Sequence, residues 1–333
     1  MTTRSLLAAL LLAATAAPAV GLDAAPPMMV TKRISAPDGN WDYVNVSADG
    51  KTLLLSRSDG VMTVDFATGT VNPHLVAAQR THGVVTATGE KVGMVTSSTS
   101  GGALLFKVAT GRVIADIKTG KKPDAALFDP ATGMFLVMDN AGGGIAVIDP
   151  AAARLVGTVA IDGALESAVA DGHGLVYVNV EDKGVLATVD VARRTVIRSV
   201  KLTGCDEPGG LALTRQGYLI AACQNGVAKI VVAKTGKQLG DVAIGSRPDA
   251  TLYDAVRERA YVPTGGDGML TMLDTVGVPR AIGVVTTQKG SRTGAVDPAT
   301  GNVYLPGARF AAAEAGQRPK QIPGSFEILV VGK

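Results

Sequence analysis

Short apolar runs separated by turn residues fill the chain from residue 28 onward, and they are too short for helices. The stretch 125–161 shows the unit, with apolar runs at 125–128, 134–138, 145–148 and 155–161. Continuous apolar runs are typical of strands covered on both faces, whereas 113–118 shifts toward the alternation of a half-exposed outer strand. Because helical periodicity of any length is absent, the pattern predicts units of four strands and excludes αβ-barrel and Rossmann folds.

The four-strand unit recurs at a fixed period. The turn Phe128-Asp129-Pro130-Ala131-Thr132-Gly133 returns at 296–301, and weaker copies keep intervals of 40 to 43 residues. A second turn series, from Asp65 to Asp274, keeps intervals of 41 to 42 residues. A period of about 40–45 residues with four strands per unit is the signature of a β-propeller. The sequence therefore predicts an all-β fold: one seven-bladed β-propeller over residues 22–333, with four-stranded antiparallel blades.

The last repeat is incomplete and predicts how the ring closes. It supplies only three strands, at 294–296, 303–305 and 326–331, while a spare strand at 28–34 precedes the first repeat. Pairing the spare strand with the last repeat completes its blade and hides an otherwise exposed sheet edge. We therefore expect the N-terminal strand to close the ring.

Residues 1–21 have the features of a secretory signal peptide. They carry one charge, Arg4, then an apolar run over 6–20 with small residues at cleavage spacing. The alternative is a membrane anchor, for which the run is short of the ~20 residues that a span needs. No later segment reaches 18 apolar residues, so we expect no membrane span after cleavage and a periplasmic or secreted, monomeric protein.

Composition narrows the classes of protein further. Hydrophobic residues make up 47% and charged residues 18%, which excludes disorder, and 41 glycines among 333 residues suit many tight turns. The net charge is +3, and loss of Arg4 with the signal peptide leaves +2. Nucleic-acid binding usually needs a larger basic excess with stacking aromatics, so nucleic acid is not the expected partner.

Cys205 and Cys223 are predicted to form a disulfide. They are eighteen residues apart, with Gly217 in a turn between two expected strands that run away and back. Both sulfurs then lie at the same end of a hairpin, and exported thiols tend to be oxidised. The alternative is a metal or redox pair, but C-x₂-C spacing and a C-x-x-C-H haem site are both absent.

Several phrases resemble the YVTN repeat of YncE-like seven-bladed β-propellers. They are Val176–Asn179, Ala260–Thr264 and Val303–Pro306, together with the Gly-x-x-Pro-Asp openings at 120–124 and 245–249. The stretch 204–212 and the ending 323–326 resemble a secreted subgroup of that family. The resemblance implies the propeller fold and export; it implies activity poorly, and some members have been linked to nucleic-acid binding. The second repeat departs from the pattern at 85–87 and 97–102.

One structural position carries candidate chemistry at the mouth of the central channel. Five residues before each first turn stand Asp42, His82, Asp124, Glu166, Gly209, Asp249 and Arg292. Among these, Asp42, Asp124, Glu166 and Asp249 are candidate ligands of a divalent cation such as Ca²⁺, although no cofactor is firmly expected. The alternative is that each acid caps backbone N–H groups where its strand begins.

Basic residues and one long loop complete the candidate ligand-binding set. Two residues before the mouth position, Arg80, Lys122 and Arg247 form a possible basic annulus for an anion, unless they are ordinary solvated charges. Trp41, the single tryptophan, either stacks on a ligand or packs. About twenty residues between 305 and 326, including Arg309 and Arg318, replace the usual short turn on the same face and predict a lid or partner-contact loop.

Two function classes follow from these residues. The favoured one is an exported binding module that takes a protein partner or a small anionic ligand at the channel mouth. The other is a metal-dependent hydrolase or lactonase using the carboxylates of the mouth. The motifs G-x-S-x-G, H-E-x-x-H and G-x-x-x-x-G-K-[ST] are absent, and three histidines cannot build a histidine-rich metal centre. No catalytic residue is therefore predicted, and a non-enzymatic role is favoured.

Overall fold

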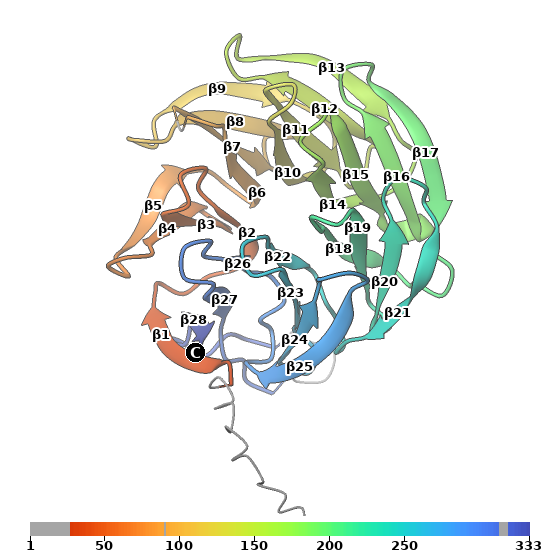
Figure 1. The fold of residues 1–333 in the computed structure, drawn as a ribbon. Helices are drawn as coiled ribbons and strands as arrows, with labels where there is room; N and C mark the ends of the chain where they lie inside the picture. The colour runs from red at the N-terminus through yellow and green to blue at the C-terminus, as the bar shows by residue number, and fades with distance from the viewer. Residues whose placement is uncertain (1–26, 90, 313–318) are drawn as a thin grey trace, which may run out of the picture.

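Seven four-stranded antiparallel sheets stand around a central axis in the computed structural model, which describes residues 27–89, 91–312 and 319–333 (Figure 1). The predicted signal peptide at 1–21 lies outside the described residues. The innermost strands surround the channel. They are β2 (Trp41–Val46), β6 (Thr81–Thr86), β10 (Pro123–Asp129), β14 (Leu165–Ala170), β18 (Pro208–Leu213), β22 (Leu252–Asp254) and β26 (Ala295–Val296). The predicted seven-bladed β-propeller is confirmed.

The two middle strands of each blade are buried on both faces, as their continuous apolar runs predicted. The second strands are β3 (Thr52–Arg57), β7 (Val92–Ser97), β11 (Met134–Asp139), β15 (Leu175–Val180), β19 (Tyr218–Cys223), β23 (Arg259–Thr264) and β27 (Val303–Gly307). The third strands are β4 (Gly60–Asp65), β8 (Gly102–Lys107), β12 (Gly144–Asp149), β16 (Val185–Asp190), β20 (Val227–Val232), β24 (Met269–Asp274) and β28 (Glu327–Gly332). Their side chains form apolar clusters between neighbouring blades, so the core is divided among the interfaces around the ring.

The outer strands lie at the periphery and are largely exposed (Figure 1). They are β5 (Val71–Ala77), β9 (Val113–Lys118), β13 (Arg154–Ala160), β17 (Thr195–Lys201), β21 (Gln238–Ala243), β25 (Arg280–Thr286) and β1 (Met29–Ser35). The one helical segment among the described residues is a 3₁₀ turn, η1 (Glu181–Lys183). No helix in this part of the chain is long and apolar enough to cross a bilayer.

The N-terminal strand closes the ring, as predicted. β1 pairs antiparallel with β28, so the last blade has the order β1-β28-β27-β26 and joins the two ends of the chain. Arg33 of β1 forms an ion pair with Glu327 of β28. Ile34 packs into a cluster with Phe326 and Ile328 that also reaches the first blade. Closure therefore combines backbone hydrogen bonds with burial of apolar side chains.

The recurring Asp-Pro-Ala-Thr-Gly turn has a hydrogen-bonding cause. Asp129 accepts bonds from the backbone N–H of Ala131 and Thr132 and from the Thr132 hydroxyl, at 3.3, 3.2 and 2.6 Å. Gly133 then takes a left-handed backbone with φ +70°, which glycine adopts without steric cost. These local requirements keep the turn recognisable in the sequence.

Other glycines allow the inner strands to crowd around the axis. A Cβ on Gly83 of β6 would lie 2.5 Å from the backbone nitrogen of Ala126 in β10. A Cβ on Gly210 of β18 would lie 2.3 Å from the carbonyl carbon of Ala250. Glycine at these positions lets neighbouring blades approach backbone to backbone, which explains part of the glycine excess.

Candidate functional site at the channel mouth

The seven residues aligned from the sequence occupy equivalent positions where the inner strands begin. In five blades the register between first and second strands shifts at this point, as between Trp41 and Val44 or between Pro123 and Ala126. Such irregularities re-aim side chains out of the sheet. The aligned residues therefore form one ring of positions at the channel mouth, and some of their side chains contact one another.

His82 is the centre of the closest cluster. Its Nδ1 lies 2.6 Å from Asp42 Oδ2 and 3.6 Å from Asp124 Oδ1, and its Nε2 lies 2.5 Å from the hydroxyl of Ser98. Burial alone would lower the pKa of His82, but the bond to Asp42 and the charges of Asp124 and Asp42 outweigh it, so the pKa is raised. The ligand atoms of Asp42, His82 and Asp124 lie within 4.8 Å of one another, which is compatible with a metal ion.

Asp124 is held in an unusual state by this cluster. Its side chain is 9% exposed. Burial and the negative charge of Asp42 raise its pKa to about 6, against the opposing charges of His82 and Lys122. The Nζ of Lys122 lies 4.0 Å from Asp124 Oδ2 and 2.6 Å from the side-chain oxygen of Asn140. The positive charges of His82 and Lys122 therefore do not offset burial and the negative charge of Asp42 at this carboxylate.

Glu166 bonds to two neutral groups and lies beside Glu181, outside the His82 cluster. Its carboxylate accepts hydrogen bonds from the Tyr43 hydroxyl at 2.6 Å and from the side-chain amide of Asn140 at 2.7 Å. Burial, with the charge of Asp124 adding to it, raises the pKa of Glu166 to about 9, although the Tyr43 bond opposes the shift. Burial and the charge of Glu166 in turn raise the pKa of Tyr43 well above its ordinary value.

Asp249 completes the acidic side of the mouth. Burial raises its pKa to about 7, although the charge of Arg292 opposes the shift. Arg292 Nε lies 3.0 Å from Asp249 Oδ2, and the Arg292 side chain is 47% exposed. Of the four candidate cation ligands, only Asp42 and Asp124 therefore meet in one cluster, while Glu166 and Asp249 bind other side chains.

Backbone capping is performed by other residues in the described part of the chain. The carboxylate of Asp139 accepts from the backbone N–H of Lys122, Ala141 and Gly142, and Asp182 accepts from that of Ala164. These acids lie between the second and third strands. The four mouth acids contact side chains instead. Asp42, Asp124 and Asp249 contact residues of adjacent blades, and Glu166 also bonds to Tyr43 of the first blade, across the channel.

The basic positions two residues upstream form an exposed rim. Arg80 and Arg247 have positive φ values of 50° and 57°, as does Glu207 at 45° in the equivalent place. A left-handed backbone costs a non-glycine residue about 1 kcal/mol or more. Within the described residues, the side chains of Arg80 and Arg247 make no hydrogen bond or ion pair. Both guanidinium groups therefore face solvent or an incoming ligand.

The described ends of the long connection between β27 and β28 contact residues at the mouth; its role as a lid or partner-contact loop stays a prediction. Phe310 packs near Trp41 with ring centroids 6.4 Å apart, and Trp41 also contacts Phe326 at 5.2 Å. Asp38, in the connector from β1 to β2, accepts from the backbone N–H of Gly324 and Phe326. Arg309 is exposed and lines a separate pocket near Arg33. The candidate residue Arg318 lies outside the described residues.

This loop helps to enclose a pocket of about 540 Å³ at the mouth. Its lining combines two aromatic rings, Trp41 and Phe310, with the side chains of His82, Arg247 and Arg292. The remaining lining residues are Asn40, Gly265 and Gly290. An aromatic surface beside two guanidinium groups is the composition expected of a site for a small ligand that carries an anionic group.

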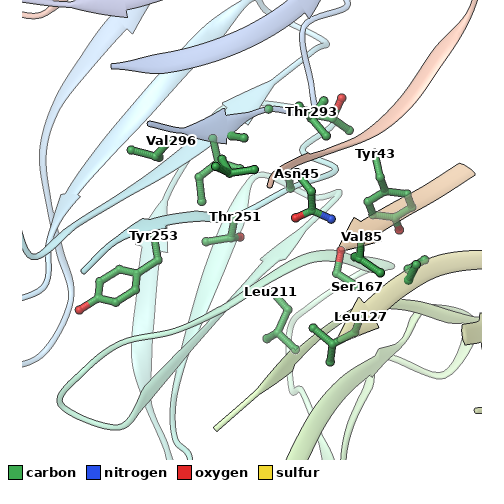
Figure 2. Close-up of a pocket in the computed structure, with 18 of the residues that line it drawn as sticks. Tyr43, Asn45, Val85, Leu127, Ser167, Leu211, Thr251, Tyr253, Thr293 and Val296 are labelled. Carbon is green, nitrogen blue, oxygen red and sulfur yellow. The ribbon is translucent and has the colours of Figure 1, made fainter. Parts of the chain in front are cut away.

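A second pocket of about 480 Å³ lies within the channel, and its lining, among the described residues, contains no charged side chain (Figure 2). Inner-strand side chains such as Asn45, Leu127 and Thr251 point into it from around the ring (Figure 2). Asn45 donates to the backbone carbonyl of Val84. Tyr43 lines this pocket and bonds to Glu166, so it contacts both the channel and an acid of the mouth.

The predicted disulfide is confirmed in the fifth blade, β18 to β21. Cys205 and Cys223 are bonded, and their Cα atoms are 5.4 Å apart. Cys223 ends β19 opposite Pro208 of β18, so the hairpin places both sulfurs at one end.

Some residues of the mouth carry no sequence signal of their own. Ser98 lies in the turn between β7 and β8, and Asn140 lies in the corresponding turn of the next blade. Tyr43 follows Asp42 within β2. Ser98 and Asn140 each lie in the turn between the second and third strands of a blade. This turn lies on the same face as the first residues of the inner strands, and that shared position is the one sequence signal that points to them.

Comparison with known proteins supports the fold and leaves the family open. No family model matches the chain, and no curated protein matches it either. The expected membership of the YncE-like family therefore stays a prediction. Hydrazine synthase of Kuenenia stuttgartiensis is similar in structure, with a TM-score of 0.73 over 88% of this chain and 98% of that chain. The two are 14% identical in sequence, so the likeness concerns the propeller fold alone.

Proposed function

We propose that the protein binds a small anionic ligand with a planar apolar part in the pocket at the channel mouth. The observation that carries this proposal is the lining of the pocket, where Trp41 and Phe310 stand with Arg247 and Arg292. Aromatic rings accept the planar part, and guanidinium groups bind carboxylates or phosphates in a bidentate manner. Propellers generally serve as scaffolds for binding or interaction, which agrees with this use.

The two arginines make unequal contributions to the pocket. The Nε of Arg292 forms an ion pair with Asp249 Oδ2 at 3.0 Å. Its terminal N–H groups are then able to bind a ligand. Arg247 is free of side-chain partners among the described residues and is held in a left-handed backbone. Arg247 is therefore the better residue to change, because its removal leaves no buried acid without a partner.

Trp41 provides a direct assay, because it is the single tryptophan of the chain and lines the pocket. Titration with phenyl phosphate and phenylacetate should change its fluorescence saturably, and uncharged phenylacetamide should bind more weakly. Arg247→Gln should weaken anion binding at least tenfold, the size of one charged hydrogen bond. Arg112→Gln, an exposed arginine between β8 and β9 on the opposite face, should leave binding unchanged. Equal binding by both variants, or no saturable response, would refute the proposal.

A divalent cation at Asp42, His82 and Asp124 is a second candidate, supported by the 4.8 Å limit that encloses their ligand atoms. Such an ion would serve the hydrolase or lactonase alternative by polarising a carbonyl group or activating water. Elemental analysis of the purified protein, with thermal melting in the presence and absence of a chelator, tests it. One bound equivalent whose removal lowers the melting temperature supports the site, and no metal with no chelator effect refutes it.

We also infer that the protein works outside the cytoplasm. The Cys205–Cys223 disulfide supports this inference, because such bonds persist in oxidising compartments. Fractionation of the producing cells, with N-terminal sequencing of the mature chain, tests it. A mature protein that starts near residue 22 in the exported fraction is expected, and an unprocessed cytoplasmic protein would contradict it.

A further inference from the structure

We propose that Ser98, His82 and Asp42 form a nucleophilic triad that hydrolyses small carboxylic esters or lactones at the channel mouth. The three side chains form a continuous hydrogen-bonded chain, with Ser98 Oγ 2.5 Å from His82 Nε2 and His82 Nδ1 2.6 Å from Asp42 Oδ2. This is the arrangement by which a histidine activates a serine hydroxyl and a carboxylate orients the histidine.

The surrounding charges fix the roles of the two imidazole nitrogens. Nδ1 faces Asp42 at 2.6 Å and Asp124 at 3.6 Å, and carboxylates only accept hydrogen bonds. In neutral His82 the proton therefore resides on Nδ1. Nε2 then carries the lone pair and accepts the proton of the Ser98 hydroxyl, which is the tautomer that a general base requires.

The triad is accessible and adjoins the proposed ligand pocket. His82 is 19% exposed at its side chain, Ser98 is half-buried in the turn between β7 and β8, and His82 itself lines the pocket of about 540 Å³. The proposal rests on the proposed function for the position of the substrate alone. Arg247 and Arg292 then favour esters or lactones that carry a second, anionic group.

Each step of the reaction balances with water as the only co-reactant. Ser98 Oγ attacks the acyl carbon while its proton passes to His82 Nε2, and the carbonyl becomes an oxyanion. The ester C–O bond then breaks, and the leaving alcohol takes the proton from His82. Water attacks the acyl-serine, gives a proton to His82 and releases the carboxylic acid, and the proton returns to Ser98. The net reaction is ester plus water giving acid plus alcohol.

The residue after the nucleophile offers one backbone donor for an oxyanion. The backbone N–H of Thr99, which follows Ser98, has no hydrogen-bond partner among the described residues. The Ser98 N–H donates to the carbonyl of Arg80 at 3.1 Å, which holds the turn beside the start of β6. A backbone N–H next to the nucleophile is a typical donor to an oxyanion.

A fluorophosphonate probe tests the nucleophile directly, because Ser98 would displace fluoride from phosphorus and keep the phosphonyl group. Stoichiometric labelling is expected by intact mass, with the label mapped to Ser98. S98A should abolish labelling and reduce kcat/KM for p-nitrophenyl butyrate and dihydrocoumarin at least 100-fold. S100A removes a hydroxyl from the same turn and should retain both. D42N, which favours the wrong imidazole tautomer, should slow labelling at least 100-fold.

The same experiment separates this proposal from the ligand pocket. S98A should still show the Trp41 fluorescence response to phenyl phosphate, because Ser98 does not line that pocket. A Ser98–His82 hydrogen bond that only stabilises the second blade would change the melting temperature in S98A without any covalent labelling of the wild type. Absence of a label at Ser98 in the folded wild-type protein, or unchanged hydrolysis in S98A, overturns the triad.

Discussion

Replacing Glu166 by glutamine tests how strongly the channel mouth disfavours negative charge. Glu166 is bonded to Tyr43 and Asn140, and burial raises its pKa from 4.5 to about 9. Glutamine has nearly the same shape; its oxygen can accept from Asn140 and its NH₂ group can donate to the Tyr43 oxygen. The substitution therefore removes the titration and keeps most of the packing.

The sign of the effect follows from proton linkage. Between about pH 4.5 and pH 9 the folded chain keeps the Glu166 proton and the unfolded chain releases it, so unfolding becomes easier as pH rises. One such proton changes the free energy of unfolding by at most ~1.4 kcal/mol per pH unit. Because Glu166 has partial access to solvent, we expect about 1–2 kcal/mol between pH 5.5 and pH 8.

Urea denaturation at pH 5.5, 7 and 8, with the disulfide intact, measures this change. The wild type should lose stability with rising pH, whereas Glu166→Gln should match it at pH 5.5, lose about 1–2 kcal/mol less by pH 8, and so be the more stable protein there. Asp206→Asn removes a carboxylate from an exposed position on the same face and should keep the wild-type slope. An unchanged slope in Glu166→Gln would show that the mouth does not hold this proton.

Three further predictions concern the parts of the fold that support the mouth. Replacing both Cys205 and Cys223 by serine should lower the free energy of unfolding by about 3 kcal/mol, measured by urea denaturation, and reductant should have no further effect. Ile34→Ala in the closing strand should cost about 2–4 kcal/mol, whereas Val196→Ala on exposed β17 should cost under about 0.5 kcal/mol; equal costs would contradict the role of closure. Asp38→Ala should increase hydrogen exchange over 321–326 and weaken ligand binding, and unchanged exchange there would show that the loop is held by other contacts.

The fold could be predicted from the sequence because its cause is local and repeated. The turn carboxylates, such as Asp129, must bond to the same backbone groups in each blade, and Gly133 must adopt a left-handed backbone. Each repeat therefore preserves residue types at fixed spacing. The ring closure was predictable for a related reason, since the last repeat lacked one strand and the N-terminus supplied one.

The partners at the mouth were not predictable in the same way. Alignment of the repeats placed Asp42, His82 and Asp124 at the same position of successive blades. In the structure the ligand atoms of these three residues lie within 4.8 Å of one another. Which of them meet depends on the rotation between neighbouring blades and on turns from the second to third strands, where Ser98 and Asn140 stand. Nothing in a single repeat encodes these contacts, because each crosses between strands or blades.

The connector between β1 and β2 links closure of the ring to the chemistry of the mouth. Asp38 in this connector holds residues 324 and 326 of the long loop, and the chain then enters β2 with Trp41 and Asp42 at its start. Trp41 contacts Phe310 in the ring that β1 and β28 close, with the loop fastened to the same connector. Opening the last blade would displace the aromatic side of the pocket and the carboxylate that orients His82 together. Ligand binding should thus stabilise the closed ring, since a ligand that binds only the folded mouth raises its stability in proportion to occupancy.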